Sequence, residues 1–231
     1  DEEYFYERSR DIIRVSQNPY KNYTEAKLYQ FTDEVTPLAK PGEELRYSNV
    51  GMALLGNILE RVTKVPYDSL TEQYTEQMGL SKTKTHLAPS IRERYLLPAY
   101  NRRQQKVPYW DFKAMAPIGA LKSTPADMLR FLQISMGQLN TPMTPPVQQA
   151  QQVRDSGSLK QMEGIGVGYG WFRSSRTIRG EKITWHNGQS GGFSSFIAFL
   201  PEQEHGVVLL ANTNGSLGKI AFQVLNVLNK E

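Results

Sequence analysis

The stretch that decides the fold reads Tyr47-Ser48-Asn49, and a second stretch far along the chain, His186-Asn187-Gly188, complements it. Between them the two motifs supply a phenol, a side-chain amide, an imidazole and an exposed backbone turn. Acyl-transfer chemistry needs such groups around a nucleophile, because protons must move and an oxyanion must be stabilised. The nucleophile itself is not evident in either motif, so the rest of the chain must be searched for it.

Around these motifs the composition is that of an ordinary soluble protein. The 231 residues are 39% hydrophobic and 22% charged, which suffices for one large core or two modest ones. The net charge is +4, but basic and acidic residues are interleaved almost everywhere. The densest basic run, residues 102–106, lacks the aromatic interleaving of a nucleic-acid surface. We therefore expect a loop or hairpin tip there, and no nucleic-acid partner.

Residue usage argues against several classes of site. The chain has no cysteine, which removes disulfides, a thiolate nucleophile and cysteine-ligated metals. Its three histidines, His86, His186 and His205, are far apart and form no H-x-x-x-H pair. We expect neither a metal nor a cofactor. No stretch approaches the ~18 apolar residues of a membrane span, so no membrane-spanning segment is expected.

The first part of the chain carries helical patterns. Residues 1–39 are expected to be helical in two pieces, the second from about Glu25 to Val35. Further helices are expected over residues 67–78, from a Thr124 cap onwards and over 147–153, with residues 81–122 irregular. The best signal follows the tyrosine motif and ends before Pro66, where apolar residues recur at helical spacing: Val50, Leu54, Leu55, Ile58, Leu59 and Val62.

From about residue 166 the pattern changes to strands. We expect strands over residues 169–173, 182–185, 194–200 and 206–211, followed by a last helix capped by Asn214 or Ser216. The run 207–210 is apolar at every position, which predicts a fully buried strand. The sequence thus predicts a mostly helical lobe over residues 1–165 and an antiparallel sheet lobe with a C-terminal helix over 166–231, both parts of one domain.

The motifs of this chain, and the order in which they occur, resemble those of the class C β-lactamase group of penicillin-recognising serine hydrolases. That group also contains DD-peptidases and esterases. The likeness covers nearly the whole chain. It runs through Pro41-Gly42, Tyr47-Ser48-Asn49, Met78-Gly79-Leu80 and residues 119–124, 168–171 and 186–193. The resemblance implies an α+β fold of the serine β-lactamase/DD-peptidase type, with a helical lobe and an antiparallel sheet flanked by a C-terminal helix.

The resemblance also implies catalytic roles. Tyr47 matches the tyrosine that relays protons between the nucleophile and the leaving group. A phenol that titrates near ~10 acts as a base only when cationic neighbours stabilise the phenolate. His186 would hydrogen-bond Tyr47, and the backbone N–H of Gln189 would form half of an oxyanion hole.

Four further residues would bind the substrate. Asn49 matches the asparagine that binds the acyl-amide group of the substrate. Asn187 would face the substrate carboxylate, Gly188 would let the substrate approach the strand edge, and Ser190 would line the same site. The histidine-asparagine pair replaces the lysine-threonine typical of true β-lactamases, which favours peptidase or esterase relatives.

The nucleophile of this family is the serine of a Ser-x-x-Lys motif. The 46 residues ahead of Tyr47 contain no serine with lysine three places on. Two later matches, at Ser81 and Ser216, are better explained as turn or cap residues. Residues 188–192 also fit the G-x-S-x-G elbow, but a strand instead of a helix is expected after them. The chain is therefore expected to be the C-terminal portion of the fold, without the nucleophile helix and the N-terminal strands.

Two functions follow as hypotheses. The first is a serine hydrolase that acts on a β-lactam, a D-Ala-D-Ala peptide or an ester through an acyl-serine intermediate. The second is a catalytically inactive module of the same fold that binds cell-wall peptide or a protein partner. The family implies a location outside the cytoplasm, in the periplasm or cell envelope. Because strand 207–210 would lack part of its cover, we expect association with the missing N-terminal segment or with further copies of the chain.

Overall fold

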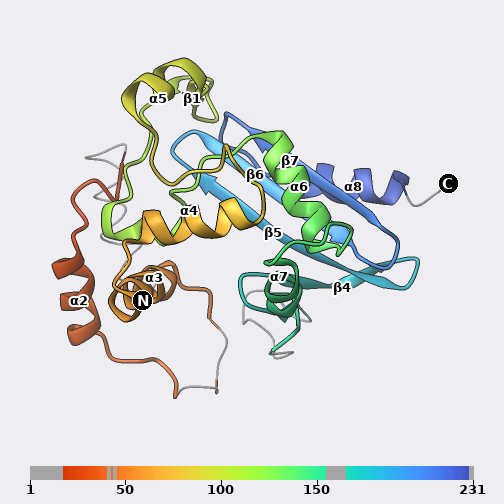
Figure 1. Cartoon of the computed structure of the whole chain (residues 1–231), viewed down its shortest axis with the longest axis horizontal. Helices are drawn as coiled ribbons and strands as arrows, with labels where there is room; N and C mark the ends of the chain where they lie inside the picture. Colours follow the sequence, from red (N-terminus) through yellow and green to blue (C-terminus); the bar gives the residue numbers. More distant parts are fainter. Residues whose placement is uncertain (1–17, 41–42, 44–45, 155–164, 229–231) are drawn as a thin grey trace.

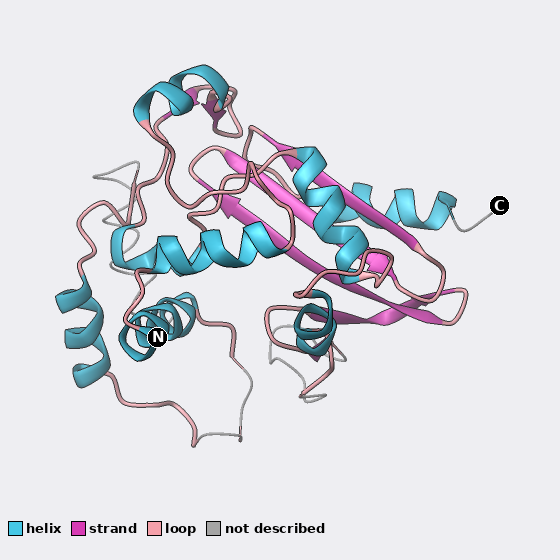
Figure 2. Cartoon of the chain, viewed as in Figure 1, coloured by secondary structure: helices cyan, strands magenta, loops and turns pink. Residues whose placement is uncertain are grey.

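The computed structural model describes residues 18–40, 43, 46–154 and 165–228, and shows helices followed by an antiparallel sheet and a last helix (Figures 1 and 2). The α+β fold class expected from the sequence is confirmed. The first of the two helical pieces expected within residues 1–39 falls largely outside the described residues, as does the Pro41-Gly42 break. No helix among the described residues is long and apolar enough to cross a membrane.

Four helices lie where the sequence predicts them. Each of three begins at a side-chain cap: Thr24 accepts a hydrogen bond from the Lys27 N–H, Ser48 from that of Gly51, and Thr124 from that of Asp127. Such caps satisfy backbone donors that lack a partner in the first helical turn. The four helices are α2 (Glu25–Glu34), α3 (Asn49–Thr63), α4 (Tyr67–Gln77) and α6 (Pro125–Ser135).

The expectation of an irregular stretch over residues 81–122 is wrong in part. The stretch contains four short elements, each too brief to leave a periodic pattern: α5 (Pro89–Tyr95), β1 (Ala99–Tyr100), β2 (Lys106–Val107) and the 3-10 helix η1 (Lys113–Ile118). Strands β1 and β2 pair as a hairpin. The basic run at residues 102–106 lies at the hairpin tip, as predicted.

A further short helix, α7 (Thr144–Ala150), begins before the predicted 147–153. Pro145 and Pro146 occupy its first turn, where a missing N–H costs no hydrogen bond. Residues 155–164 of the predicted linker lie outside the described residues.

The sheet has five strands in the order β3-β4-β5-β6-β7, all antiparallel. The strand expected at 169–173 begins later, because Gly170 at φ 76° turns the chain just before it. The strand expected at 182–185 is longer, so the His186 motif lies within it. The strands are β3 (Gly166–Val167), β4 (Phe172–Ile178), β5 (Glu181–Ser190), β6 (Phe193–Leu200) and β7 (His205–Ala211).

Helices cover the two faces of the sheet. Successive residues of β6 point to opposite faces. Phe196 and Ala198 belong to the core under α8 (Gly218–Leu228), whereas Ile197 and Phe199 pack with Leu132 of α6. Figure 1 shows α6 in front of the sheet and α8 behind it. Helix α6 therefore covers the sheet although it lies within the predicted helical lobe; the division at residue 165 stays a prediction.

Strand β7 differs from the expectation of full burial. Val207 is buried, but Leu210 is 42% exposed. The cause lies in the topology, because β7 is the last strand of the described sheet and pairs with β6 alone. A strand that is apolar on both faces at a sheet edge has the composition of a central strand without the corresponding cover.

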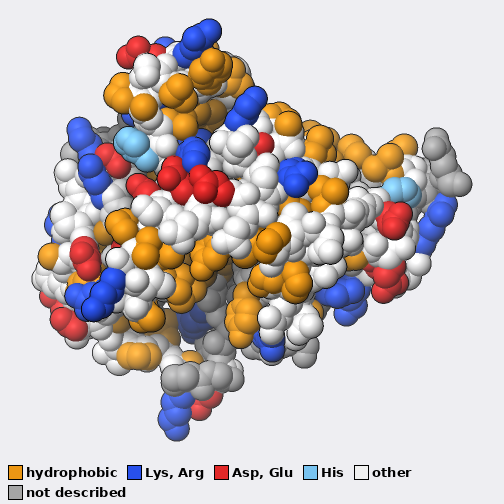
Figure 3. Space-filling view, viewed as in Figure 1, with side chains coloured by type: hydrophobic (Ala, Val, Ile, Leu, Met, Phe, Trp, Pro, Cys, Tyr) orange, Lys and Arg blue, Asp and Glu red, His pale blue; other side chains and the backbone are white. Residues whose placement is uncertain are grey.

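Helix α3 packs through its small residues. Its buried positions are Ala53, Gly56 and Asn57, which face η1, and the Asn57 side chain donates hydrogen bonds to the Ala53 and Ala114 carbonyls. The large apolar residues point away from this contact, and the surface view shows apolar side chains below α4 (Figure 3). Their exposed fractions are Met52 45%, Leu55 48%, Ile58 45%, Leu59 43% and Val62 76%. The periodic pattern thus predicted the helix correctly, but most of its apolar face is open.

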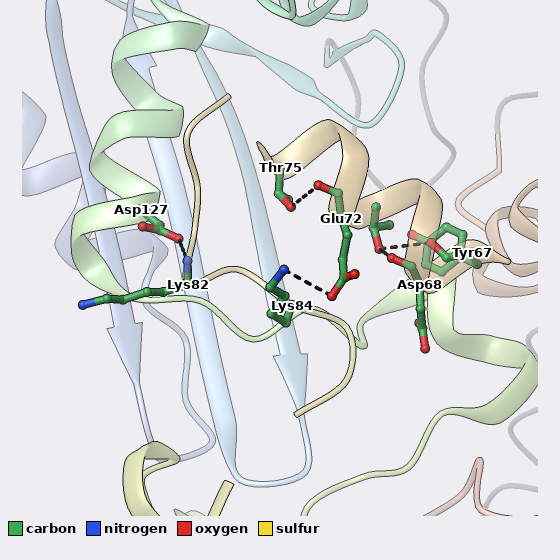
Figure 4. Close-up of polar contacts among 8 residues, drawn as sticks. Tyr67, Asp68, Glu72, Thr75, Lys82, Lys84 and Asp127 are labelled. Atoms are coloured by element: carbon green, nitrogen blue, oxygen red, sulfur yellow. Dashed lines mark hydrogen bonds and ion pairs between the residues drawn. The ribbon is translucent and has the colours of Figure 1, made fainter. Parts of the chain in front are cut away.

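One buried carboxylate ties α6 to the loop after α4 (Figure 4). Asp127 accepts hydrogen bonds from the Lys82 N–H and the Thr83 hydroxyl, both at 2.8 Å. Beside it, Lys84 pairs with Glu72 of α4 at 3.2 Å. These contacts give the Ser81 region a structural role, in agreement with its prediction as a turn.

The α3–η1 contact predicts the effect of a single methyl group. A Cβ at Gly56 would lie 2.1 Å from Pro117 Cγ, so Gly56→Ala should lower the free energy of unfolding by about 1–3 kcal/mol through overpacking. Urea unfolding followed by circular dichroism measures this. The matched control is Gly51→Ala on the same helix, where the new Cβ meets nothing closer than 3.4 Å. Equal stability of the two variants would contradict the described packing.

Candidate active site

Two motifs that are remote in the sequence converge at the sheet. The ring centroids of Tyr47 and His186 lie 6.5 Å apart. Phe172 joins them, since its ring stacks on His186 at 5.2 Å and lies 6.2 Å from Tyr47. The structure therefore brings a phenol and an imidazole, from the helical part and from β5, to one place.

The start of α3 determines where the first motif lies. The Ser48 hydroxyl accepts the Gly51 N–H at 3.0 Å and fixes the beginning of the helix. Tyr47 immediately precedes this cap, and its side chain is 45% exposed. Asn49 is the first helical residue, so its amide lies at the same end of α3 as Tyr47.

Tyr20 is a residue of this site that sequence reasoning missed. It is buried, it hydrogen-bonds the Asn49 side chain, and Tyr47 lies close enough to raise its pKa. Burial is the main cause of the raised pKa of Tyr20. One local signal was available: Asn18-Pro19 marks a turn, and the Asn18 carboxamide accepts the Tyr20 N–H at 3.1 Å.

An aromatic cluster connects Tyr20 to the second motif. The Tyr20 ring stacks on Phe112 at 5.3 Å and meets Trp110 edge-on at 5.5 Å. Trp110 in turn packs on Gly191, where a Cβ would lie 2.3 Å from the indole Cδ1. The turn after β5 is thereby held against the helical part of the molecule.

The edge of β5 is open where the second motif lies. Pairing with β4 ends at Phe172 and Trp185, whereas pairing with β6 continues from Thr184 to Ser190. Backbone N–H groups alternate between the two edges of a strand. The Ile183 N–H points to β4, where it donates to Ser174 Oγ at 3.1 Å. The N–H groups of Asn187 and Gln189 therefore point to this same, open edge.

The remaining predicted residues lie along the same end of β5. Gly188 is paired with Ser195, and a Cβ there would lie 2.6 Å from Ser195 Oγ, so packing alone gives one reason for glycine. The Ser190 carbonyl accepts a hydrogen bond from Asn214 at 2.8 Å. A turn then leads directly into β6, which rules out the strand–turn–helix geometry of a G-x-S-x-G elbow.

Burial sets the protonation of the two central groups. It raises the pKa of Tyr47 above its ordinary value of 10.0, and no described cation offsets this. It lowers the pKa of His186 below 6.5, with a hydrogen bond at the Asn187 backbone acting in the opposite direction. At neutral pH the pair is thus a neutral phenol beside a neutral imidazole. Within the described part of the chain, no group of three or more His, Cys, Asp or Glu side chains is placed to hold a metal ion.

Comparison with known proteins identifies the family. Residues 6–227 match the β-lactamase family model, so this chain belongs to the β-lactamase family. Protein flp of Staphylococcus aureus (strain NCTC 8325 / PS 47) is 28% identical over 186 residues, which cover 76% of this chain and 34% of flp. The chain thus spans about a third of the length of this curated relative.

Solved structures share the fold. A class C β-lactamase superposes with a TM-score of 0.78 at 22% identity, covering 90% of this chain and 64% of that one. The D-alanine carboxypeptidase AmpC from Burkholderia cenocepacia gives a TM-score of 0.77 at 21% identity, covering 91% of this chain and 69% of that one. The serine β-lactamase/DD-peptidase fold expected from the sequence is confirmed.

The lowered pKa of His186 predicts a pH dependence of stability. Below the ordinary imidazole pKa of ~6.5, His186 binds a proton in the unfolded chain but not in the folded chain. The free energy of unfolding therefore falls as the pH drops, until the pH reaches the lower pKa of His186 in the folded chain. His186→Gln should reduce this fall between pH 7 and 5, measured by urea unfolding at several pH values. The control, His86→Gln, replaces an exposed histidine and should leave the slope unchanged. An unaltered slope in His186→Gln would contradict the burial described here.

Proposed function

We propose that this chain forms part of a serine hydrolase of the class C β-lactamase type, which cleaves an amide or ester through an acyl-serine intermediate. The convergence of Tyr47 and His186 at the open edge of β5 carries this proposal. Suitable substrates are β-lactams, peptides ending in D-Ala-D-Ala, and esters, since all three present an acyl carbonyl. Similar structures include a class C β-lactamase and a D-alanine carboxypeptidase, which supports the first two substrate classes.

The nucleophile in this proposal comes from a segment outside residues 1–231. Neither candidate serine of the chain suits the role: Ser81 lies in a loop held by Asp127, and Ser216 lies in the loop before α8. A serine and lysine in Ser-x-x-Lys spacing, supplied beside Tyr47, would complete the site.

The reaction proceeds in two stages. The serine Oγ attacks the acyl carbonyl while Tyr47, ionised to the phenolate by the cation of the completed site, accepts the hydroxyl proton at Oη. The Gln189 N–H and the N–H of the serine donate hydrogen bonds to the oxyanion. Tyr47 then gives the proton to the leaving nitrogen or oxygen as its bond to the acyl carbon breaks. Water attacks the acyl-serine by the same route and releases the acid.

The other residues bind and orient the substrate. Asn49, held by Tyr20, binds the acyl-amide group. Asn187 is exposed on β5 and faces the substrate carboxylate. Gly188 and Ser190 line the strand edge along which the substrate lies. His186, whose ring centroid lies 6.5 Å from that of Tyr47, would hydrogen-bond Tyr47 in the completed site. Because its imidazole is neutral at pH 7, it can accept as well as donate.

The raised pKa of Tyr47 supports a contribution from outside the chain. A half-exposed phenol whose pKa is raised by desolvation, with no cation lowering it, holds its proton at neutral pH and is a poor base. The lysine of a Ser-x-x-Lys segment would place an ammonium beside it and lower that pKa. In this proposal the chain supplies the proton relay of Tyr47, the side-chain amide of Asn49 and the oxyanion-binding N–H of Gln189. The incoming segment supplies the serine nucleophile and the positive charge of its lysine.

The open face of α3 gives that segment a place to pack. Met52, Leu55, Leu59 and Val62 follow one another at helical spacing along this face, and Tyr47 directly precedes the helix. An amphipathic helix laid on such a face buries apolar residues at matching spacing. The substrates named above occur outside the cytoplasm, so a periplasmic or cell-envelope location goes with this proposal.

Labelling with a fluorescent penicillin tests the function. The 231-residue chain alone should form no covalent adduct, because the acylated serine is absent. The chain extended by the preceding coding sequence of its gene should form one adduct, and Tyr47→Phe in the extended protein should slow acylation by at least ~100-fold through loss of the proton relay. In-gel fluorescence over time gives the rate.

Tyr74→Phe serves as the control, because it removes an exposed hydroxyl on α4 and should leave acylation unchanged. An adduct on the chain alone would contradict the external nucleophile. If the extended protein forms no adduct and leaves nitrocefin, D-Ala-D-Ala peptides and p-nitrophenyl esters intact, the hydrolase is ruled out and the inactive binding module takes its place.

Substitution on α3 tests the packing of the segment. Leu55→Lys with Leu59→Lys should weaken association of the separately expressed segment with the chain by at least ~10-fold, because two apolar side chains of ~1.5 kcal/mol or more each lose their burial. Isothermal titration calorimetry measures the affinity. Asp33→Lys on the exposed side of α2 is the control. Unchanged affinity in the double variant would place the segment elsewhere.

A further inference from the structure

A cavity lies away from the Tyr47 site. Its volume is about 430 Å³, within the ~300–1,000 Å³ range of small-molecule sites. Walls come from the C-terminal half of α3, the start of α4, α5 and the segments around residues 85–87 and 109–122. Neither Tyr47 nor His186 lines it.

Lys122 is the central charged group of this cavity. Its side chain is partly buried, and its Nζ donates a hydrogen bond of 2.7 Å to the Thr85 carbonyl. Among the described residues no carboxylate forms an ion pair with it. Burial lowers the pKa of Lys122, which shows that its charged form is poorly solvated there.

A second cation, Arg92, faces the same space. Its guanidinium lies over the Tyr109 ring at 4.7 Å, which holds it at the cavity wall. Its proximity is the next cause of the lowered pKa of Lys122. Arg92 likewise has no ion-pair partner among the residues that the structure describes. The two cations therefore repel one another, and neither is neutralised by an ion pair among the described residues.

Three carboxylates also line the cavity, Glu60, Asp68 and Asp111, and none forms an ion pair with Lys122 or Arg92. Asp68 and Asp111 both raise the pKa of Lys122, but each acts more weakly than Arg92. Asp111 is already paired with Lys113 at 3.1 Å. Asp68 is exposed and forms no ion pair among the described residues. Lys122 and Arg92 thus both face the cavity without an ion-pair partner among the described residues.

We propose that this cavity binds a small organic anion, a carboxylate on an apolar or aromatic body. The carboxylate would lie between Lys122 and Arg92 and accept charge-assisted hydrogen bonds from both. The body would contact the aromatic side chains of Tyr109 and Trp110, which line the same space. The proposal stands on this cavity alone and does not depend on the hydrolase proposed above.

Trp110 offers a direct readout of occupancy. Its indole lines the cavity and also packs on Gly191 in the turn after β5. In nitrogen-15 NMR spectra of the 231-residue chain, benzoate should shift the Trp110 indole N–H signal in a saturable manner. Benzamide, which has the same ring without the charge, should not. Lys122→Met and Arg92→Gln should each weaken benzoate binding by about tenfold or more.

A control variant and a second cavity variant accompany Lys122→Met. Lys82→Met removes the same charge from an exposed position outside the cavity, so it should leave benzoate binding unchanged. If Lys122→Met does not fold, Arg92→Gln on the exposed side of α5 decides alone. The proposal is overturned if benzoate causes no saturable shift, if benzamide matches it, or if binding survives in Arg92→Gln.

Discussion

Pairing between β4 and β5 ends at Phe172 and Trp185, and the candidate site depends on this early end. Because β5 continues to Ser190 along β6 alone, the backbone of its second half is open on one edge. The cap at Ser48 starts α3 such that Tyr47 meets that edge, and the Tyr20–Trp110 cluster holds the following turn in register. Without the open edge, the Gln189 N–H would be used by a neighbouring strand and could not meet a substrate.

The site is electrostatically incomplete within the described chain. Tyr47 and His186 are both neutral at pH 7, because burial disfavours the charged form of each. A proton relay between a nucleophile and a leaving group needs a cation nearby. Most of the apolar face of α3 beside Tyr47 is exposed, and the outer edge of strand β7 has no strand paired with it in the described sheet. Charge and packing thus agree in favouring a further segment at the same end of α3.

Local signals predicted the elements well and their environment poorly. The Thr124 cap, the helical spacing before Pro66 and the strands around His186 depend on neighbouring residues, and the structure contains each. Which face of α3 is buried depends on tertiary packing. The helix buries Gly56 against Pro117 and not its large apolar side chains, and the periodicity of the sequence does not reveal that contact. Tyr20 was missed for the same reason, since its contact with Asn49 joins residues that are not neighbours in the sequence. The catalytic and binding roles of all the predicted site residues, from Tyr47 to Ser190, stay predictions.

The titration of the Tyr47 phenol tests the central claim most directly. Carbon-13 NMR of tyrosine labelled at Cζ reports the ionisation of each phenol, and Tyr47→Phe assigns the signal. The account predicts a Tyr47 pKa above 10.0 in the 231-residue chain. It predicts a lower pKa once the segment with the nucleophile and its lysine is joined. An unchanged Tyr47 pKa in the extended protein would contradict the claim that Tyr47 and the incoming segment form one site.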